Sequence, residues 1–237
     1  MRLPFFAVLA CLGIFLCGCG SMSTPTSTHN PSSSLRYLAL GDSYTIGESV
    51  DASQRWPVQL SKLLEERGRQ VDLTMIARTG WTVNELWQGI QQSPPQGSYD
   101  LVTLLIGVND EYRGGDVGQY RKDFQFMLDK SIAYAQGKPQ HVIVLSIPDW
   151  GVTPYAQQYD PRTAAQIGAE IDAFNAVNKE ESLKAGVQYV DVTPVSRSAA
   201  SDPGLIAADG LHPSGRMYTA WAQLTLPAAL SVAGLAP

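Results

Sequence analysis

The chain has 237 residues, which is enough for one α/β domain with a sizeable apolar core. It carries 17 basic and 22 acidic side chains, a formal net charge of −5, and no long run of like charge. A nucleic-acid-binding protein needs a basic face for the phosphates, so this balance argues against nucleic acid as the main partner.

The first residues resemble a bacterial lipoprotein signal. Arg2 supplies a positive charge and residues 3–16 are almost wholly apolar, but this run is shorter than the roughly 20 residues of a membrane span. The run ends in "LCGC", which resembles a lipobox. The resemblance implies that residues 1–18 are a signal peptide cleaved after Gly18, and that Cys19 carries a lipid. An ordinary secretory signal with incidental cysteines is the alternative.

Residues 19–34 are rich in Ser, Thr and Pro, and we interpret them as a flexible tether. The lipid anchor implies a location in the bacterial cell envelope. Gly20 is not the aspartate that commonly retains lipoproteins at the inner membrane, so an outer-membrane location is expected if the organism has an outer membrane. The three cysteines are Cys11, Cys17 and Cys19. The mature domain is therefore expected to lack disulfides, a thiol nucleophile and a cysteine metal site.

From Leu35 the pattern is globular to the end, which predicts a single domain over residues 35–237. Five short apolar runs predict strands; they are Leu35–Leu40, Val71–Ala77, Leu101–Ile106, His141–Ile147 and Val187–Val192. Longer amphipathic runs between them predict helices; they are Trp56–Arg67, Val83–Gln91, Val117–Ala135, Thr163–Lys184 and Ser214–Leu230. This alternation indicates an α/β fold with a parallel sheet covered by helices on both faces. Ligands of such sheets bind at the carboxyl ends of the strands.

A serine nucleophile is predicted at the end of the first strand. Ser43 follows "LALGD", and its hydroxyl needs a base to take its proton. His29 lies in the tether and His141 at the opposite end of a strand, so His212 in "ADGLHPSG" is the remaining histidine. Asp209 lies three residues earlier and can fold back onto the far ring nitrogen. Ser43, Asp209 and His212 can therefore make a catalytic triad.

Acyl transfer also needs hydrogen-bond donors for the developing oxyanion. The backbone N–H of Gly80 follows the second strand, and the side-chain amide of Asn109 follows the third. The N–H of Ser43 is the third candidate donor for the oxyanion hole.

These residues resemble a known family. "GDSYTIGE", the glycine of "RTGWT", "GVND" and "DGLHP" are similar, in the same order, to the four signature blocks of the SGNH (GDSL-type) esterase/lipase superfamily. The resemblance implies a three-layer, flavodoxin-like fold with a five-stranded parallel sheet. It also implies Ser43 as nucleophile, Gly80 and Asn109 in the oxyanion hole, and Asp209 with His212 completing the triad.

Aromatic side chains near the predicted site are candidates for substrate binding. Trp81 adjoins Gly80, and Trp150 and Tyr155 lie in the long segment after the fourth strand. They could hold an acyl chain or stack on a sugar. Packing of these side chains onto the core is the alternative.

The sequence thus predicts a serine hydrolase that cleaves carboxylic esters, either an esterase or lipase or a carbohydrate O-deacetylase. Its partners are expected to be a small ester or an acylated glycan or lipid, with membrane contact through the anchor, and the chain is expected to be a monomer. No cofactor and no metal are expected, since zinc and P-loop motifs are absent. The alternative is a catalytically inactive envelope lipoprotein that binds its ligand on the same fold.

Overall fold

The computed structural model describes Met1 and residues 34–236. The predicted lipidation site, Cys19, and nearly all of the predicted signal peptide and tether lie outside these residues. Within the described part, no helix is both long and apolar enough to cross a membrane.

Five parallel strands form one sheet in the order β2-β1-β3-β4-β5. The strands are β1 (Leu35–Gly41), β2 (Val71–Ala77), β3 (Leu101–Leu105), β4 (Val142–Leu145) and β5 (Gln188–Val190). Strands β3 and β4 are buried along their whole length, and β1 is buried at every position but one. Such two-sided burial explains why apolar residues predominate on both faces of these strands. The structure confirms the predicted α/β class and parallel sheet.

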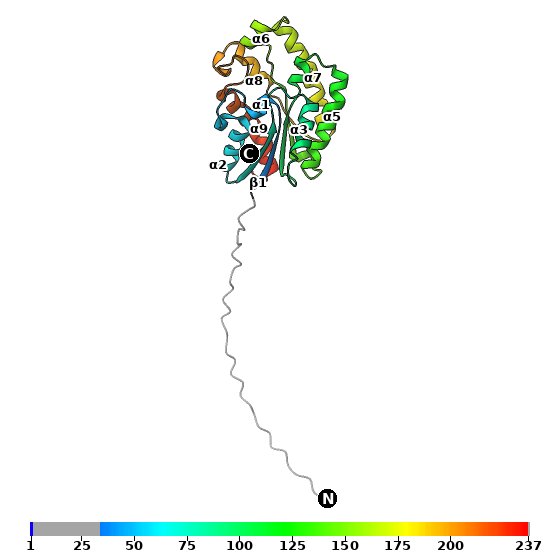
Figure 1. The fold of residues 1–237 in the computed structure, drawn as a ribbon. Coiled ribbons are helices and arrows are strands. Elements are labelled where there is room, and N and C mark those ends of the chain that lie inside the picture. Colours follow the sequence, from blue (N-terminus) through cyan, green and yellow to red (C-terminus); the bar gives the residue numbers. More distant parts are fainter. Residues whose placement is uncertain (2–33, 237) are drawn as a thin grey trace. The chain divides into compact units, whose positions relative to one another are not determined.

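Helices cover both faces of the sheet (Figure 1). The pair α2 (Trp56–Glu66) and α9 (Gly215–Ala233) packs on one face, and α3 (Val83–Gln92), α5 (Val117–Tyr134) and α7 (Ala164–Lys184) pack on the other. All five predicted helices are present. Two begin one residue later than predicted, because the side chains of Thr163 and Ser214 serve as N-caps.

Three strands are shorter than predicted: β3 ends at Leu105 rather than Ile106, β5 lacks the residues at both ends of the predicted range 187–192, and β4 is shortened at both ends. Residues 139–141 form a 3₁₀ helix, η2 (Pro139–His141), so His141 precedes β4 rather than opening it. At the carboxyl end, Ser146 and Ile147 leave the strand and bond side chains of neighbouring segments.

Short helices that the sequence analysis did not predict follow four strands. They are α1 (Ser43–Ile46), α4 (Val108–Tyr112), α6 (Pro154–Tyr159) and α8 (Thr193–Arg197). The remaining 3₁₀ helices are η1 (Ala52–Gln54), η3 (Ser198–Ala200) and η4 (Pro203–Leu205). Each has at most six residues, which is too few to produce a helical period in the sequence. Together with the neighbouring loops they build the end of the sheet at which the strands terminate (Figure 1).

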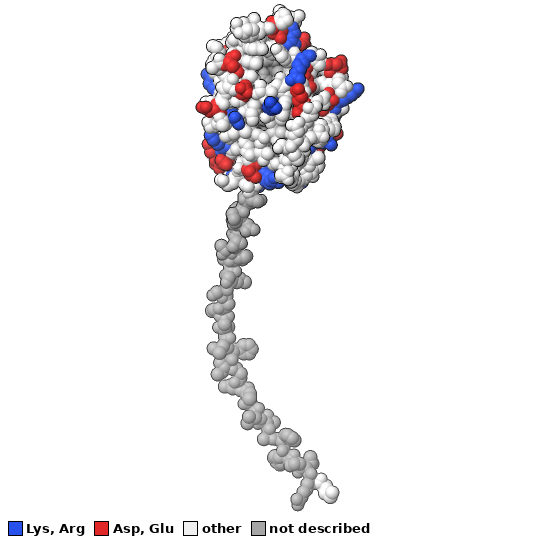
Figure 2. Space-filling model, viewed as in Figure 1, with Lys and Arg blue, Asp and Glu red and all other residues white. Residues whose placement is uncertain are grey.

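On the face shown in Figure 2, Lys and Arg are scattered among Asp, Glu and a large share of uncharged surface. This face carries no continuous basic patch of the kind that binds phosphates.

Candidate active site

Ser43 occupies a tight turn between β1 and α1. It is the first residue of α1 and is only 4 % exposed. Asp42 caps this helix by accepting a hydrogen bond from the Tyr44 N–H on Oδ1 at 3.0 Å. The N–H at the first helical position has no partner within the helix, so the Ser43 N–H remains available to a ligand. The turn requires a glycine at position 41, since a Cβ there would lie 2.2 Å from Thr45 Oγ1.

His212 and Asp209 come together in the loop before α9. The ring Nδ1 of His212 lies 2.6 Å from Asp209 Oδ2. The backbone N–H groups of Leu211 and His212 each donate to Asp209 Oδ1 at 2.9 Å. The carboxylate therefore orients both the loop and the ring, and because Nδ1 contacts Asp209, Nε2 is the ring nitrogen that remains for proton transfer.

Asp209 is held in its charged form. Partial burial works to raise its pKa, but hydrogen bonds from the Ser49 hydroxyl, the two backbone N–H groups and the His212 ring lower the pKa to about 2. A carboxylate that is ionised at neutral pH can stabilise the imidazolium formed during acyl transfer. Ser49 was missed by the sequence analysis, because nothing in the sequence links it to a residue 160 positions away.

Ser43 and His212 line one pocket at the carboxyl ends of the strands, with a cavity volume of about 150 Å³. Its other lining residues are Tyr44, Thr79, Gly80, Val108, Asn109, Tyr112, Trp150, Tyr155 and Leu211. In the part of the chain that the structure describes, no hydrogen bond joins the Ser43 hydroxyl to the His212 ring. Such contacts commonly tighten only when substrate binds.

The two predicted oxyanion donors lie in the same pocket. Gly80 has φ +86°, and its carbonyl accepts from Arg113 Nη2 at 2.6 Å, while its N–H has no partner among the described residues. Asn109 donates one amide hydrogen to the Trp81 carbonyl at 2.9 Å. This bond fixes the amide and leaves its second hydrogen free, so both residues can donate to a charged oxygen in the pocket.

The Trp81 side chain, predicted as a substrate-binding residue, lies away from this pocket. Trp81 does not line the pocket, and its ring packs over Gly89 in α3: a Cβ on Gly89 would lie 2.1 Å from the Trp81 ring. Its backbone carbonyl serves the site instead, by holding Asn109.

Aromatic side chains form one wall of the pocket. Trp150 and Tyr155, the other two residues predicted to bind substrate, line the pocket together with Tyr112. The rings of Tyr112 and Trp150 lie edge to face with centroids 5.3 Å apart, and Tyr159 packs on Tyr155 at 5.0 Å. Tyr112 was not predicted, although its position three residues after Asn109 places it one helical turn further along α4.

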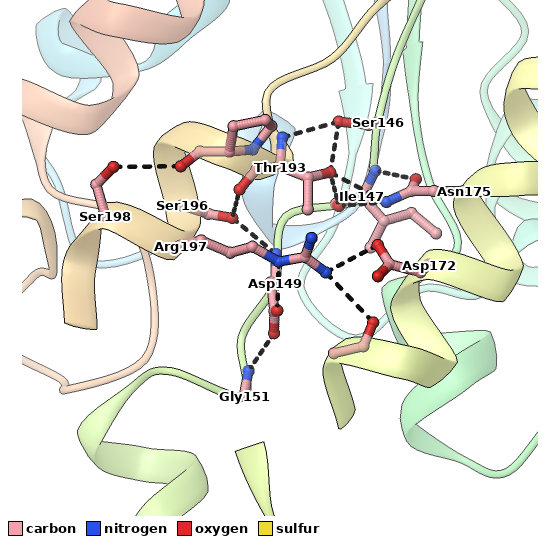
Figure 3. A network of polar contacts seen from close by, with 12 residues as sticks. Ser146, Ile147, Asp149, Gly151, Asp172, Asn175, Thr193, Ser196, Arg197 and Ser198 are labelled. Carbon is pink, nitrogen blue, oxygen red and sulfur yellow. Dashed lines mark hydrogen bonds and ion pairs between the residues drawn. The ribbon is translucent and has the colours of Figure 1, made fainter. Parts of the chain in front are cut away.

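A polar network fixes the segment between β4 and Trp150 (Figure 3). The Asn175 amide in α7 accepts from the Ile147 N–H at 2.7 Å and donates to the Ile147 carbonyl at 2.9 Å. Two residues later, Asp149 Oδ2 accepts from Arg197 Nε at 2.9 Å. Other members of the network are Ser146, Gly151, Asp172, Thr193, Ser196 and Ser198. These bonds replace strand pairing and hold Trp150 in place at the pocket.

Metal-binding side chains do not gather in this site. Among the residues that the structure describes, no three His, Cys, Asp or Glu side chains are placed to hold a metal ion.

The sequence matches the model of the GDSL-like lipase/acylhydrolase family over residues 39–220. No curated protein matches it significantly. Solved structures with a similar fold include one titled TesA (22 % identity, TM-score 0.64, 83 % of this chain and 99 % of that one). A lipase/acylhydrolase from Enterococcus faecalis has 18 % identity and TM-score 0.66, over 86 % of this chain and 98 % of the other. Axe2, an acetylxylan esterase from Geobacillus stearothermophilus, has 18 % identity and TM-score 0.61, over 85 % of this chain and 95 % of the other.

Proposed function

Because the chain belongs to the GDSL-like lipase/acylhydrolase family, it is an ester hydrolase, and we propose that Ser43 is its nucleophile, with His212 and Asp209 completing a triad. The observation that supports this most directly is the 2.6 Å contact between His212 Nδ1 and Asp209 Oδ2, in a loop that borders the same pocket as Ser43.

In the proposed reaction, Ser43 Oγ forms a bond to the carbonyl carbon of the ester while its proton moves to His212 Nε2. The negative charge that develops on the carbonyl oxygen is stabilised by N–H groups of Ser43, Gly80 and Asn109. As the tetrahedral intermediate collapses, the ester C–O bond breaks and His212 returns the proton to the departing alcohol.

The acyl-enzyme is then hydrolysed by the same groups. A water molecule gives one proton to His212 Nε2 and attacks the acyl carbon. The bond to Ser43 Oγ breaks, Ser43 regains its proton, and the carboxylic acid leaves.

The size and lining of the pocket favour a short, uncharged acyl group. A cavity of about 150 Å³ accommodates a molecule of roughly the size of benzene, which corresponds to an acyl chain of about six carbons or fewer. No Asp, Glu, Lys or Arg lines it. The aromatic wall can also stack on a sugar ring, so we propose short-chain esters, O-acetylated carbohydrates included, as the substrate class.

The test compares purified wild type with Ser43→Ala on p-nitrophenyl esters from acetyl to long acyl chains. We expect hydrolysis by the wild type alone, fastest for the short chains. A fluorophosphonate probe should label the wild type and not Ser43→Ala, since labelling reports an activated hydroxyl without the natural substrate. Background rates in both proteins together with no labelling would contradict the triad and favour the binding lipoprotein. A preference for long chains would contradict the substrate class.

We further propose that Cys19 carries a lipid that anchors the enzyme in the cell envelope, and that the enzyme is a monomer. Globomycin-type inhibition of lipoprotein processing and the Cys19→Ser change should each leave an uncleaved precursor without lipid label. Unaffected processing would contradict the anchor. Light scattering after size-exclusion chromatography tests the monomer.

A further inference from the structure

Ser49 contacts the carboxylate of Asp209 from a different part of the chain. Its hydroxyl donates to Asp209 Oδ2 at 2.6 Å, the same oxygen that lies 2.6 Å from His212 Nδ1. Among the described residues, the other oxygen, Oδ1, accepts only from backbone N–H groups of the loop that contains Asp209. Among the residues that the structure describes, Ser49 is thus the one outside this loop that hydrogen-bonds Oδ2 of Asp209.

Ser49 is also held close to the nucleophile. The N–H groups of Gly47 and Glu48 both donate to the Ser43 carbonyl at 3.0 Å, which fixes the start of the loop containing Ser49. The hydroxyl therefore links the segment of Ser43 to the loop of Asp209, although the two are far apart in sequence.

The backbone at Ser49 is strained for a serine. Its φ is +64°, and Gln136 is the other non-glycine residue with positive φ in the described part of the chain. L-residues are disfavoured in this conformation, whereas glycine adopts it freely. Strain of this kind persists where the side chain or its surroundings compensate for it. The hydrogen bond of the Ser49 side chain goes to Asp209, so that contact is what a glycine would lose.

We propose that Ser49 is a positioning residue, which holds Asp209 Oδ2 so that His212 stays oriented toward Ser43. This inference rests on the proposed triad. The electrostatics agree with it: after burial, which acts in the opposite direction, the Ser49 hydroxyl is the largest single contribution to the lowered pKa of Asp209.

The test uses three variants of the full protein. Ser49→Gly removes the donor and relieves the backbone, and Ser49→Thr keeps the donor but adds a branched Cβ where φ is positive. Gln136→Gly is the matched control, since it relieves the same kind of strain away from the pocket. We expect Ser49→Gly to be at least as stable to heat as the wild type, yet to lose about tenfold in kcat with KM unchanged. Ser49→Thr should melt at a lower temperature and retain most of kcat, and Gln136→Gly should keep the wild-type kcat.

Of the two Ser49 variants, Ser49→Gly is therefore expected to be the more stable to heat and the one with the lower kcat. If Ser49→Gly keeps the wild-type kcat, or if kcat follows thermal stability across the variants, the hydroxyl has no positioning role and the inference is wrong.

A spectroscopic measurement separates this inference from the proposed function. We expect the proton between His212 Nδ1 and Asp209 Oδ2 to give a low-field NMR signal, which is assigned by its absence in His212→Gln. Ser49→Gly should shift or broaden this signal, and Ser49→Thr and Gln136→Gly should leave it in place. An unchanged signal in Ser49→Gly contradicts the inference, even if the wild type hydrolyses none of the tested esters. Absent hydrolysis with a shifted signal contradicts the proposed function alone.

Discussion

Trp150 donates its indole N–H to the buried carboxylate of Glu111 at 2.8 Å. Arg162 Nη1 bonds the other oxygen of that carboxylate at 2.6 Å, and its guanidinium lies over the Trp150 ring, 5.3 Å from the ring centroid. The three side chains hold one another, so the indole that lines the pocket is fixed on two sides. These contacts fix the orientation of the Trp150 ring at the pocket.

Replacement of Trp150 should change the acyl preference. We predict that Trp150→Ala raises the kcat/KM ratio of octanoyl to acetyl esters by about tenfold, because removal of the ring opens the pocket to longer chains. Ratios between substrates are independent of how much protein is folded. Trp87→Ala, which removes an indole that packs on Phe126, is the control and should keep the wild-type ratio. An unchanged ratio in Trp150→Ala would show that this ring does not limit chain length.

Removal of the Asn109 amide should slow the chemical step. Asn109→Ala is expected to lower kcat by roughly 10²–10³ with little change in KM, because the donor acts mainly on the charge of the transition state. Asn84→Ala on the exposed face of α3 serves as control and should leave kcat unchanged. Near wild-type rates in Asn109→Ala would remove this side chain from the oxyanion hole.

A side chain at position 41 should disrupt the turn that carries Ser43. The Cβ of Gly41→Ala would lie 2.2 Å from Thr45 Oγ1 and 2.4 Å from the Leu105 carbonyl oxygen. We expect a loss of at least about 3 kcal/mol in the free energy of unfolding, measured by urea denaturation. Gly118→Ala, on the exposed surface of α5, should stay within about 1 kcal/mol of the wild type. Wild-type stability in Gly41→Ala would mean that the turn can widen without cost.

Three buried carboxyl groups should make the domain more stable in mild acid. Burial raises the pKa of Asp42 to about 8, of Glu111 to about 7 and of Asp110 to about 6. Their unfolded pKa values are close to 4, so between about pH 4 and 8 the folded state binds protons that the unfolded state releases. The stabilisation is complete below the unfolded pKa and is lost as the pH rises through the folded values.

The free energy of unfolding should therefore increase as the pH falls from 8 to 5. Asp209 has the opposite effect on stability, because its pKa is lowered in the folded protein. It stabilises the fold above its unfolded pKa, and this stabilisation is lost as the pH falls toward about 2. Urea denaturation at several pH values provides the measurement. Asp42→Asn should flatten the profile, since it removes the group with the largest change in pKa. Stability that is constant or increases between pH 5 and 8 would show that these carboxyl groups are ionised in the folded protein.

The fold could be predicted because its signals are local. Strands β1 and β3 are mostly apolar, and the capping box of Thr82 with Glu85 marks the start of α3 in the sequence itself. The spacing of Asp209 and His212 was equally informative, since a three-residue loop can bring a carboxylate back to the ring that follows it.

What could not be predicted depends on the direction of side chains and on contacts between distant segments. Trp81 is adjacent to Gly80 in sequence, but sequence adjacency does not fix which way a ring points, and this ring packs on Gly89. Ser49 meets Asp209 only after the sheet brings the first and last loops together. Because the two residues are 160 positions apart, no local sequence pattern indicates their contact.

The pocket combines residues from the first strand turn and from the last loop of the domain. In the proposed triad, Ser43 is synthesised long before His212, so its hydroxyl has no base while the polypeptide emerges from the ribosome. The proposed mechanism therefore requires that the loop containing His212 has been translated and has packed beside the turn that carries Ser43 before hydrolysis can begin.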